Sequence, residues 1–192
     1  MPNKSEIILV RQCRKGNVKA QYKLYRLYAK GMFNVAVRMV GDSQAAEDIL
    51  QEAFIKVFKG LDKLKNDAAF GGWLKRIVIN LCIDYSRKER FVFIEIDDLK
   101  SNDLVVEEID EDMDTALVHK LIKKLPEGAR QILVMRALEG YKHAEIGEEL
   151  GISESTAKTQ FFRARHLLAK MIKEEWYEDK SGKISERKTT TA

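Results

Sequence analysis

The sequence has few cysteines and no long apolar run. Its two cysteines, Cys13 and Cys82, lie far apart and outside any Cys-x-x-Cys spacing. This excludes a disulfide scaffold and a cysteine-based zinc site, and it favours a reducing cytoplasm. No apolar stretch approaches the roughly 18 residues of a membrane span, so we expect no membrane insertion. The apolar run 7–10 is too short for the core of a signal peptide.

Only two prolines and eleven glycines interrupt the chain, and the stretches between them have helical periodicity. Over residues 45–58, apolar side chains recur at steps of three and four, and Asp42 or Ser43 is the expected N-cap. A second amphipathic helix follows, opened by Asn66 or Asp67, with apolar residues from Trp73 onward. Segment 92–96 (VFIEI) is a short alternating run and a weak strand signal. We therefore predict an all-α fold.

Charge divides the chain more sharply than hydropathy does. Residues 92–116 contain ten acidic side chains and one base, so this segment carries a formal charge of −9 and the rest of the chain +13. Runs of like charge resist compaction and are typical of solvated linkers. We predict two small basic helical domains, residues 18–91 and 117–172, joined by the acidic linker 92–116. A polar tail without fixed structure, residues 173–192, follows them.

The predicted C-terminal domain has the residue order of a helix-turn-helix motif. Its first helix begins with Pro126 at the first position, where the missing N–H costs nothing. A short second helix over residues 143–150 ends at Gly151, and a third helix begins with Ser153 as its cap. Gly147 is small at the place where the two helices of the motif cross.

The third helix of this motif has a polar face that could read DNA. A recognition helix uses its first turns for base edges and its later basic residues for phosphates. The side chains that we expect to be exposed on this face are Glu154, Ser155, Lys158, Thr159, Gln160, Arg163 and Arg165. A basic, solvated helix face without a ligand is the alternative.

In the predicted N-terminal domain, the helix over residues 45–58 combines a polar face with an apolar one. Asp48, Gln51 and Glu52 lie on the polar face, and Ile49 lies on the face that packs. Two interpretations are open. The helix is an ordinary surface helix, or its charged face binds a basic partner.

Three segments taken together resemble a known family. They are AEDILQEAFIKVF (46–58), FGGWLKRIVINLCIDYSRKERF (70–91) and the segment 125–172, which begins LPEGARQILVMRALEGY. Their order and separation are similar to regions 2 and 4 of bacterial sigma factors of the small extracytoplasmic-function (ECF) class. The resemblance implies a dissociable RNA polymerase subunit that directs the core enzyme to a promoter. Such a subunit is not itself an enzyme, and we expect no cofactor and no metal.

The resemblance also implies roles for single residues. It implies contacts with the coiled coil of the β′ subunit of polymerase for Asp48, Ile49, Gln51 and Glu52. It implies binding of the −10 element by the loop 62–69 and the helix that follows, through Lys65, Asn66, Arg76, Asn80, Asp84 and Arg87. It implies binding of the −35 element by Glu154, Ser155, Lys158, Thr159, Arg163 and Arg165, with the two arginines near phosphates. The β flap of polymerase and an anti-sigma factor are further implied partners.

Two features depart from the family pattern. Gly71 and Gly72 stand where larger residues are common, and a glycine inside a helix costs about 1 kcal/mol relative to alanine. The two glycines therefore favour a start only at Trp73, with a more flexible base-capturing loop before it, as the alternative to a helix opened by Asn66 or Asp67. Ala157 and Gln160 replace the commoner Val and Arg of the recognition helix, so the preferred −35 sequence cannot be carried over.

Two other classes of protein stay open on the sequence alone. A helix-turn-helix regulator would bind operator DNA without polymerase, usually as a dimer. A nuclease would hold magnesium on linker acids such as Asp110, but a metal site needs ligands on a rigid scaffold. The three histidines, His119, His143 and His166, lie on different segments without ligand spacing.

Overall fold

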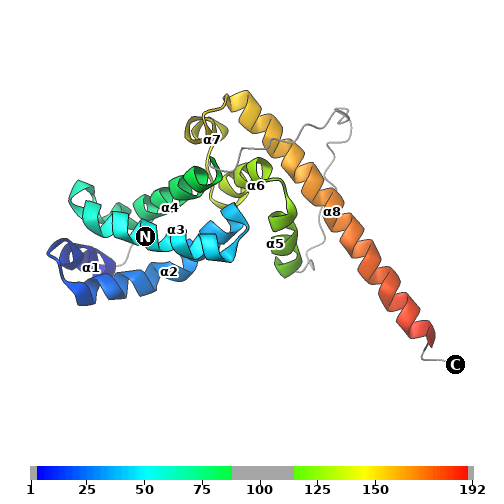
Figure 1. Cartoon of the computed structure of the whole chain (residues 1–192), viewed down its shortest axis with the longest axis horizontal. Coiled ribbons are helices and arrows are strands. Elements are labelled where there is room, and N and C mark those ends of the chain that lie inside the picture. Colours follow the sequence, from blue (N-terminus) through cyan, green and yellow to red (C-terminus); the bar gives the residue numbers. More distant parts are fainter. Residues whose placement is uncertain (1–3, 88–114, 190–192) are drawn as a thin grey trace. The chain divides into compact units, whose positions relative to one another are not determined.

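The computed structural model describes residues 4–87 and 115–189, and for residues 176–189 it describes the backbone alone. Every regular element in these ranges is a helix, which confirms the predicted all-α class. The chain divides into two units, Met1–Phe91 and Val92–Ala192 (Figure 1). The VFIEI segment and all but the last two residues of the predicted acidic linker lie outside the described residues.

The described part of the first unit contains α1 (Lys4–Arg14), α2 (Val18–Val40), α3 (Ser43–Gly60) and α4 (Phe70–Arg87). Helix α2 packs against the other three, and α3 also packs against α4 (Figure 1). Side chains that are at most 4% exposed fill the space between them: Leu24, Ala36, Met39, Ala53, Phe54, Phe70, Leu74 and Val78. Removal of this apolar surface from water is the main contribution to the stability of the unit.

Capping residues set the turns between these helices. Asn17 Oδ1 accepts a hydrogen bond from the N–H of Ala20 at 3.0 Å, and Asp42 Oδ1 accepts one from the N–H of Ala45 at 2.7 Å. Gly41 has a φ of 81°, which ends α2 in the left-handed conformation that glycine tolerates best. Asp42 is therefore the cap of α3, as one of the two sequence alternatives predicted.

Helix α4 begins at Phe70, so the predicted start at Trp73 is wrong. Phe70 is fully buried, and its ring packs edge-on against Tyr28 with the centroids 5.3 Å apart. Gly71 faces the same tyrosine, because a Cβ built on it would lie 2.9 Å from Tyr28 Oη. The burial of Phe70 and this close approach of α2 and α4 outweigh the low helix propensity of glycine.

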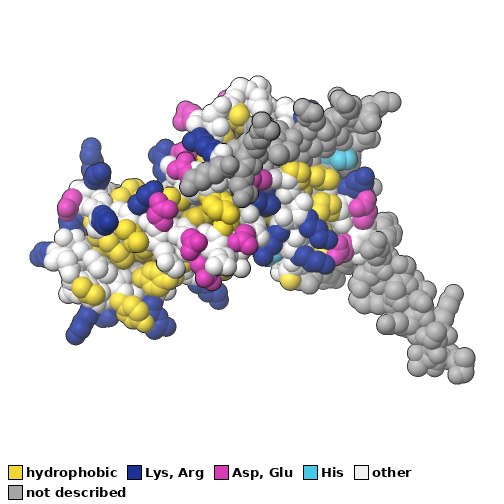
Figure 2. Space-filling view, viewed as in Figure 1, with side chains coloured by type: hydrophobic (Ala, Val, Ile, Leu, Met, Phe, Trp, Pro, Cys, Tyr) yellow, Lys and Arg dark blue, Asp and Glu magenta, His cyan; other side chains and the backbone are white. Residues whose placement is uncertain are grey.

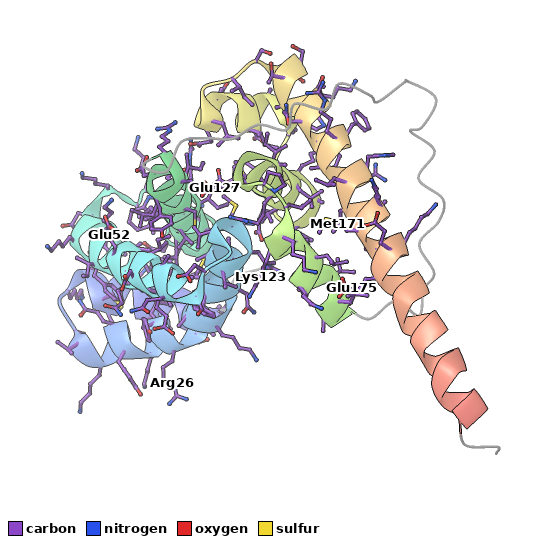
Figure 3. The ribbon with its side chains drawn as sticks, turned by 45° about the vertical axis from the view of Figure 1, so that its right-hand side comes forward. Arg26, Glu52, Lys123, Glu127, Met171 and Glu175 are labelled. Carbon is purple, nitrogen blue, oxygen red and sulfur yellow. The ribbon has the colours of Figure 1, made fainter. Side chains whose placement is uncertain are left out.

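The described part of the second unit contains α5 (Thr115–Lys124), α6 (Glu127–Leu133), α7 (His143–Leu150) and α8 (Glu154–Thr189). Helices α5, α6 and α7 each pack against α8. Glu175 of α8 faces α5, where its carboxylate accepts hydrogen bonds from Lys120 at 2.6 Å and Lys124 at 3.3 Å (Figure 3). Arg130 of α6 donates to two backbone carbonyls at the end of α5, at 3.1 Å each, so acceptors at that terminus are satisfied.

Two boundaries in this unit differ from the prediction. Pro126 is the N-cap of α6 and not its first residue, because its carbonyl accepts the first helical hydrogen bond, from the N–H of Arg130 at 2.9 Å. Helix α6 passes into a π-helical turn, Val134–Leu138, which ends before Gly140 with a φ of 80°. Helix α8 continues to Thr189, so the tail predicted to lack fixed structure is helical over most of its length. No proline follows Pro126 to interrupt it.

The sequence predicts no membrane insertion, and the described helices agree with this expectation. None of the described helices is both long enough and apolar enough to cross a membrane.

Candidate functional site

The outer face of α3 presents three of the four residues predicted to bind polymerase. Asp48, Gln51 and Glu52 are exposed, and the Glu52 carboxylate lies 2.9 Å from Lys56 Nζ (Figure 3). An exposed ion pair of this kind contributes little to stability, so Glu52 can exchange it for a partner at low cost. Ile49 is 5% exposed. Its side chain therefore packs in the core and orients α3, and it offers almost no contact surface.

A groove with a volume of about 350 Å³ lies between α3 and α2. It is lined by Tyr25, Ala29, Lys30 and Phe33 of α2 and by Glu47, Leu50 and Gln51 of α3. The lining is mixed: four aromatic or aliphatic residues lie beside a base from α2 and an acid and an amide from α3. The Tyr25 ring rests edge-on against Phe54, with the centroids 4.8 Å apart, so this aromatic wall is well packed. A groove that combines apolar and charged residues from both helices fits an amphipathic partner helix.

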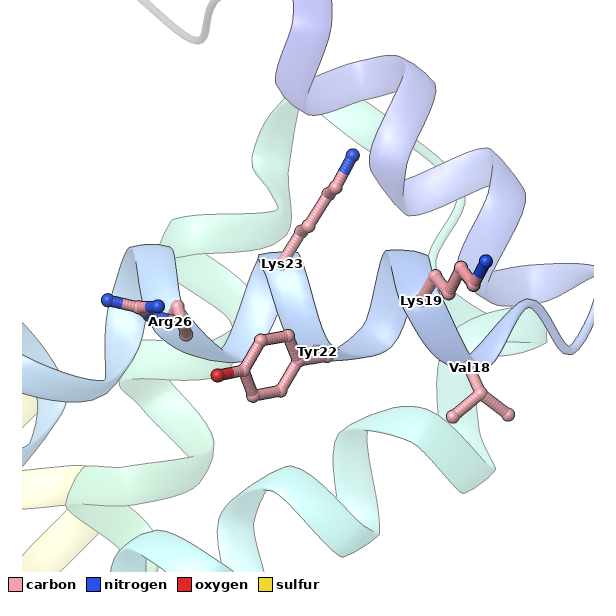
Figure 4. Close-up of a pocket in the computed structure, with 5 residues that line it drawn as sticks. All are labelled: Val18, Lys19, Tyr22, Lys23 and Arg26. Atoms are coloured by element: carbon pink, nitrogen blue, oxygen red, sulfur yellow. The ribbon is translucent and has the colours of Figure 1, made fainter.

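The basic side of the groove continues along α2. Four exposed bases recur at helical spacing on this helix: Lys19, Lys23, Arg26 and Lys30. Beside them, Val18 and Tyr22 are 72% and 60% exposed (Figure 4). Figure 2 shows hydrophobic side chains intermixed with Lys, Arg, Asp and Glu side chains over the first unit. Helix α2 contains no acidic residue, so this stripe is uniformly basic. The sequence interpretation missed it, although the spacing of the bases was visible.

A short loop between α3 and α4 carries the next predicted residues. It contains two single turns of 3₁₀-helix, Leu61–Lys63 and Asp67–Ala69. Asn66 Oδ1 caps the second turn by accepting a hydrogen bond from the N–H of Ala68 at 3.0 Å. Lys65 and Asn66 are both exposed. The loop therefore presents the two predicted −10 residues next to each other, directly before α4.

This loop is fastened to α1 by two arginines. The carboxylate of Asp67 accepts hydrogen bonds from Arg11 Nε at 2.8 Å and from Arg14 Nη2 at 2.7 Å. Arg14 also donates to the carbonyls of Leu61 and Leu64, at 3.3 and 3.2 Å. The hydrogen bonds from Arg11 and Arg14 lower the pKa of Asp67 from its usual 3.8, so this carboxylate is ionised at neutral pH. The sequence interpretation did not find this connection.

Helix α4 carries the remaining four predicted −10 residues at steps of four, four and three. Arg76, Asp84 and Arg87 are exposed, and Asn80 is half-buried between them. Arg87 Nη1 lies 3.6 Å from Asp84 Oδ1. Amide, carboxylate and guanidinium groups thus alternate along one stripe that starts where the loop ends. Such a stripe has donors and acceptors for unstacked bases and positive charge for the backbone.

In the second unit, α7 and α8 form the predicted helix-turn-helix motif. A Cβ built on Gly147 would lie 2.7 Å from the carbonyl oxygen of Ile152, so the crossing requires glycine. Gly151 has a φ of 70° and ends α7 as predicted. Ser153 Oγ accepts a hydrogen bond from the N–H of Thr156 at 3.0 Å and caps α8.

The structure exposes most of the predicted residues of α8. The exposed residues are Glu154, Ser155, Lys158, Thr159 and Arg165, and Arg163 is half-buried. Gln160 is only 6% exposed, so its predicted place on the exposed face is wrong. It lies three residues after Ala157 and four before Ala164, and both alanines are fully buried. The helical repeat therefore places Gln160 on the packed face.

Basic and aromatic side chains surround the start of α8. Partial burial, and then the charges of Arg136 and Lys158, lower the pKa of His143 from its usual 6.5, so its imidazole is neutral at physiological pH. The His143 ring packs against Phe161 at a centroid distance of 5.4 Å, and the Arg165 guanidinium lies 5.9 Å from the same phenyl ring. Positive charge at this end of the motif suits a phosphate backbone.

The described residues contain neither a metal-binding cluster nor an exposed cysteine thiol. No group of three or more His, Cys, Asp and Glu side chains within residues 4–87 and 115–175 is arranged to hold a metal ion. Cys13 and Cys82 are free and buried, and burial raises their pKa values to about 11 and about 12. A buried, protonated thiol is a poor nucleophile.

Comparison with known proteins identifies the family. Residues 24–92 match the family model for Sigma-70 region 2, and residues 115–168 match the model for Sigma-70 region 4. The chain is 30% identical over 178 residues to the ECF RNA polymerase sigma factor SigW of Bacillus subtilis, across 86% of this chain and 95% of that protein. It is 31% identical over 177 residues to the RNA polymerase sigma-H factor of Pseudomonas aeruginosa, across 85% and 92%.

The chain therefore belongs to the sigma-70 family, in its ECF class. It is a sigma factor, which acts in promoter-specific initiation of transcription.

Solved structures of similar fold support the helical architecture. CnrH in complex with the cytosolic domain of CnrY has a TM-score of 0.53 and 23% identity, over 88% of this chain and 98% of that one. The sigma factor RpoE in complex with the anti-sigma factor NepR, from Bartonella quintana, has a TM-score of 0.54 and 20% identity, over 81% and 98%.

Proposed function

We propose that this sigma factor binds the polymerase core through α3 and the groove between α2 and α3. The polar contacts come from Asp48, Gln51 and Glu52, which share an exposed face, while the buried Ile49 holds that face in place. The groove, with its mixed apolar and charged lining, receives a helix of the β′ coiled coil, and the basic stripe of α2 pairs with acidic residues on that partner. The observation that carries the proposal is this groove, whose α3 side is continuous with the predicted contact residues.

The same unit reads the −10 element. Lys65 and Asn66 on the loop bind a base that has left the stack, and the stripe on α4 holds the neighbouring strand. The support is geometric, since both residues are exposed on a capped loop that leads directly into α4. Hydrogen-bonding groups with adjacent positive charge are what single-strand recognition requires.

The helix-turn-helix motif of the second unit reads the −35 element. Glu154, Ser155, Lys158 and Thr159 lie in the first turns of α8, where a recognition helix meets base edges. Arg163 and Arg165 lie one turn later and bind phosphates. Replacement of Lys158 by alanine is expected to change the preferred −35 sequence. Replacement of Arg165 by alanine is expected to weaken all promoters evenly and to reduce the log–log salt slope by about one unit.

The proposal also covers the domain boundaries, the further partners and the absence of catalysis by this chain. The two promoter-reading modules span residues 18–91 and 117–172, the acidic segment 92–116 joins them, and the polar segment 173–192 follows. The β flap of polymerase contacts the second module, and an anti-sigma factor is a regulatory partner, as for RpoE with NepR. The chain itself performs no catalysis, since RNA synthesis belongs to the polymerase.

Charge reversal on α3 tests the core contact. Asp48→Lys with Glu52→Lys is expected to weaken binding to the polymerase core by about tenfold or more, because both substitutions place positive charge against the basic residues that the acidic face of α3 is proposed to contact. The matched control is Glu148→Lys with Glu174→Lys, which makes the same change of charge at exposed positions of the second unit. Circular dichroism checks that both variants keep the fold. Equal core binding by the two variants would contradict the proposed contact.

A further inference from the structure

Helix α1 lies outside residues 24–92, the part of the chain that matches region 2, yet it holds the loop that precedes α4. Four hydrogen bonds connect them. Asp67 receives one from Arg11 and one from Arg14, and Arg14 adds two more to the carbonyls of Leu61 and Leu64. The guanidinium of Arg14 therefore bridges backbone groups at the start and middle of the loop and the carboxylate at its end.

We propose that Arg14 and Asp67 are positioning residues for promoter recognition. They fix the loop 61–69 in the conformation in which Lys65 and Asn66 face the −10 element. This inference rests on the proposed role of the loop. It adds that recognition depends on an element of the chain that the family match does not cover, and that neither positioning residue needs to touch DNA.

The contacts of the loop distinguish the residue that fixes its conformation, Asp67, from the residues that are free to contact DNA, Lys65 and Asn66. Both carboxylate oxygens of Asp67 are engaged by arginines, and only 15% of its side chain is exposed. Lys65 and Asn66, in contrast, are exposed between the two 3₁₀ turns. A loop whose carbonyls at Leu61 and Leu64 are already hydrogen-bonded needs less ordering when DNA binds, and such preorganisation raises affinity without a new contact.

The two arginines differ in how strongly they bind the loop. The side chain of Arg14 is 30% exposed and makes three hydrogen bonds to the loop. The side chain of Arg11 is 66% exposed and makes one. A shielded, multiply bonded guanidinium is less weakened by salt and water than an exposed one, so Arg14 is the main contributor. A lysine at position 14 could replace the charge but not the forked set of contacts.

The test uses holoenzyme assembled from the full chain and purified polymerase core, on a promoter fragment that this holoenzyme selects from genomic DNA. Open-complex formation is measured with permanganate on three templates: the selected promoter, one with single-base changes in the −10 element, and one with changes in the −35 element. The variants are Arg14→Gln, Arg14→Lys, Asp67→Asn and the double variant Arg14→Gln with Asp67→Asn. Lys15→Gln is the matched control, since Lys15 is the next residue and its side chain is exposed.

Arg14→Gln is expected to reduce discrimination between the selected and altered −10 elements roughly tenfold, the size expected for loss of charge-assisted hydrogen bonds. Discrimination at −35 and binding to the core are expected to stay unchanged. Asp67→Asn should cause a smaller loss than Arg14→Gln, because Arg14 keeps its hydrogen bonds to the carbonyls of Leu61 and Leu64. The double variant should lose at least as much discrimination as Arg14→Gln and less than the sum of the two single losses, because both residues share one hydrogen bond. Arg14→Lys should recover only part of the discrimination, and Lys15→Gln should behave as the unaltered chain.

Two results would overturn the inference while leaving the proposed function in place. In one, the unaltered chain discriminates −10 sequences and Arg14→Gln discriminates them equally well. In the other, Arg14→Gln weakens responses to both promoter elements to the same degree, as a general loss of folding would. If the unaltered holoenzyme does not discriminate −10 sequences at all, the proposed role of the loop is itself wrong.

Discussion

Two adjacent glycines at the start of α4 are expected to respond in opposite ways to the same substitution. A Cβ on Gly72 meets no atom within 4 Å, whereas a Cβ on Gly71 would lie 2.9 Å from Tyr28 Oη and 3.0 Å from Tyr28 Cε1. Tyr28 cannot move away easily, because its hydroxyl donates to the carboxylate of Glu6 and its ring packs against Phe70. The pair therefore measures the close approach of α2 and α4, with helix propensity held constant.

The expected magnitudes follow from these distances. Gly72→Ala should stabilise the first unit by about 0.5–1 kcal/mol, the usual advantage of alanine over glycine in a helix. Gly71→Ala gains the same advantage but overpacks the contact with Tyr28, which costs about 1–3 kcal/mol. A net loss of up to about 2.5 kcal/mol is expected for Gly71→Ala. The two variants should then differ by about 1–3 kcal/mol in their free energies of unfolding.

Urea denaturation of the full chain, followed by fluorescence, measures this difference. The chain has two tryptophans, Trp73 and Trp176, so a Trp176→Phe background leaves Trp73 as the reporter of the first unit. With a typical dependence of 1–2 kcal/mol per molar urea, the midpoints of the two variants should be separated by about 1 M. Adding Tyr28→Phe should recover part of the loss in Gly71→Ala, because it removes the nearest atom. A Gly71→Ala variant as stable as Gly72→Ala would refute the close approach.

Three further outcomes are expected from the burial of single residues. Cys13 and Cys82 are at most 3% exposed, with pKa values raised by burial, so iodoacetamide at pH 8 should label them only after unfolding; rapid labelling of the native chain would contradict their burial. Because the pKa of His143 is lower in the fold than the ordinary 6.5, the second unit should be most stable above pH 6.5 and lose stability as the pH falls through the lowered value. His143→Gln should flatten this dependence in thermal unfolding between pH 5 and 8, and an unchanged pH profile would count against it. Gly147→Ala should destabilise the motif by about 1–3 kcal/mol and abolish −35 recognition, because its Cβ would press against the carbonyl of Ile152; normal binding in a gel shift with holoenzyme would show that the crossing tolerates a side chain.

Local signals in the sequence predicted the parts of the fold that depend on neighbouring residues. Gly151 and Ser153 mark the turn before α8 because a left-handed glycine and an N-cap act within a few residues of their own position. Asp42 caps α3 for the same reason. Family resemblance indicated the binding surfaces only as segments, and burial then separated Ile49 from the exposed residues beside it.

Contacts between distant segments could not be predicted in this way. No residue near Gly71 in the sequence indicates that Tyr28 packs against it. Glycine propensity alone therefore placed the start of α4 three residues too late. Arg14 and Asp67 are separated by 53 positions and belong to no shared periodic pattern. Gln160 was placed on the exposed face by its polarity, whereas its helical position between Ala157 and Ala164 decided its burial.

The central claim is that the two units act together as a promoter-specific subunit. Run-off transcription tests it most directly, with purified polymerase core and genomic fragments, in the presence and absence of this chain. The expected result is a set of transcripts with discrete start sites that appear only when the chain is added. These transcripts should be lost with Asp48→Lys and Glu52→Lys, and the free chain should bind the same fragments weakly. Two results would contradict the role as a promoter-specific polymerase subunit: transcripts that do not depend on the chain, or tight sequence-specific binding by the chain without polymerase.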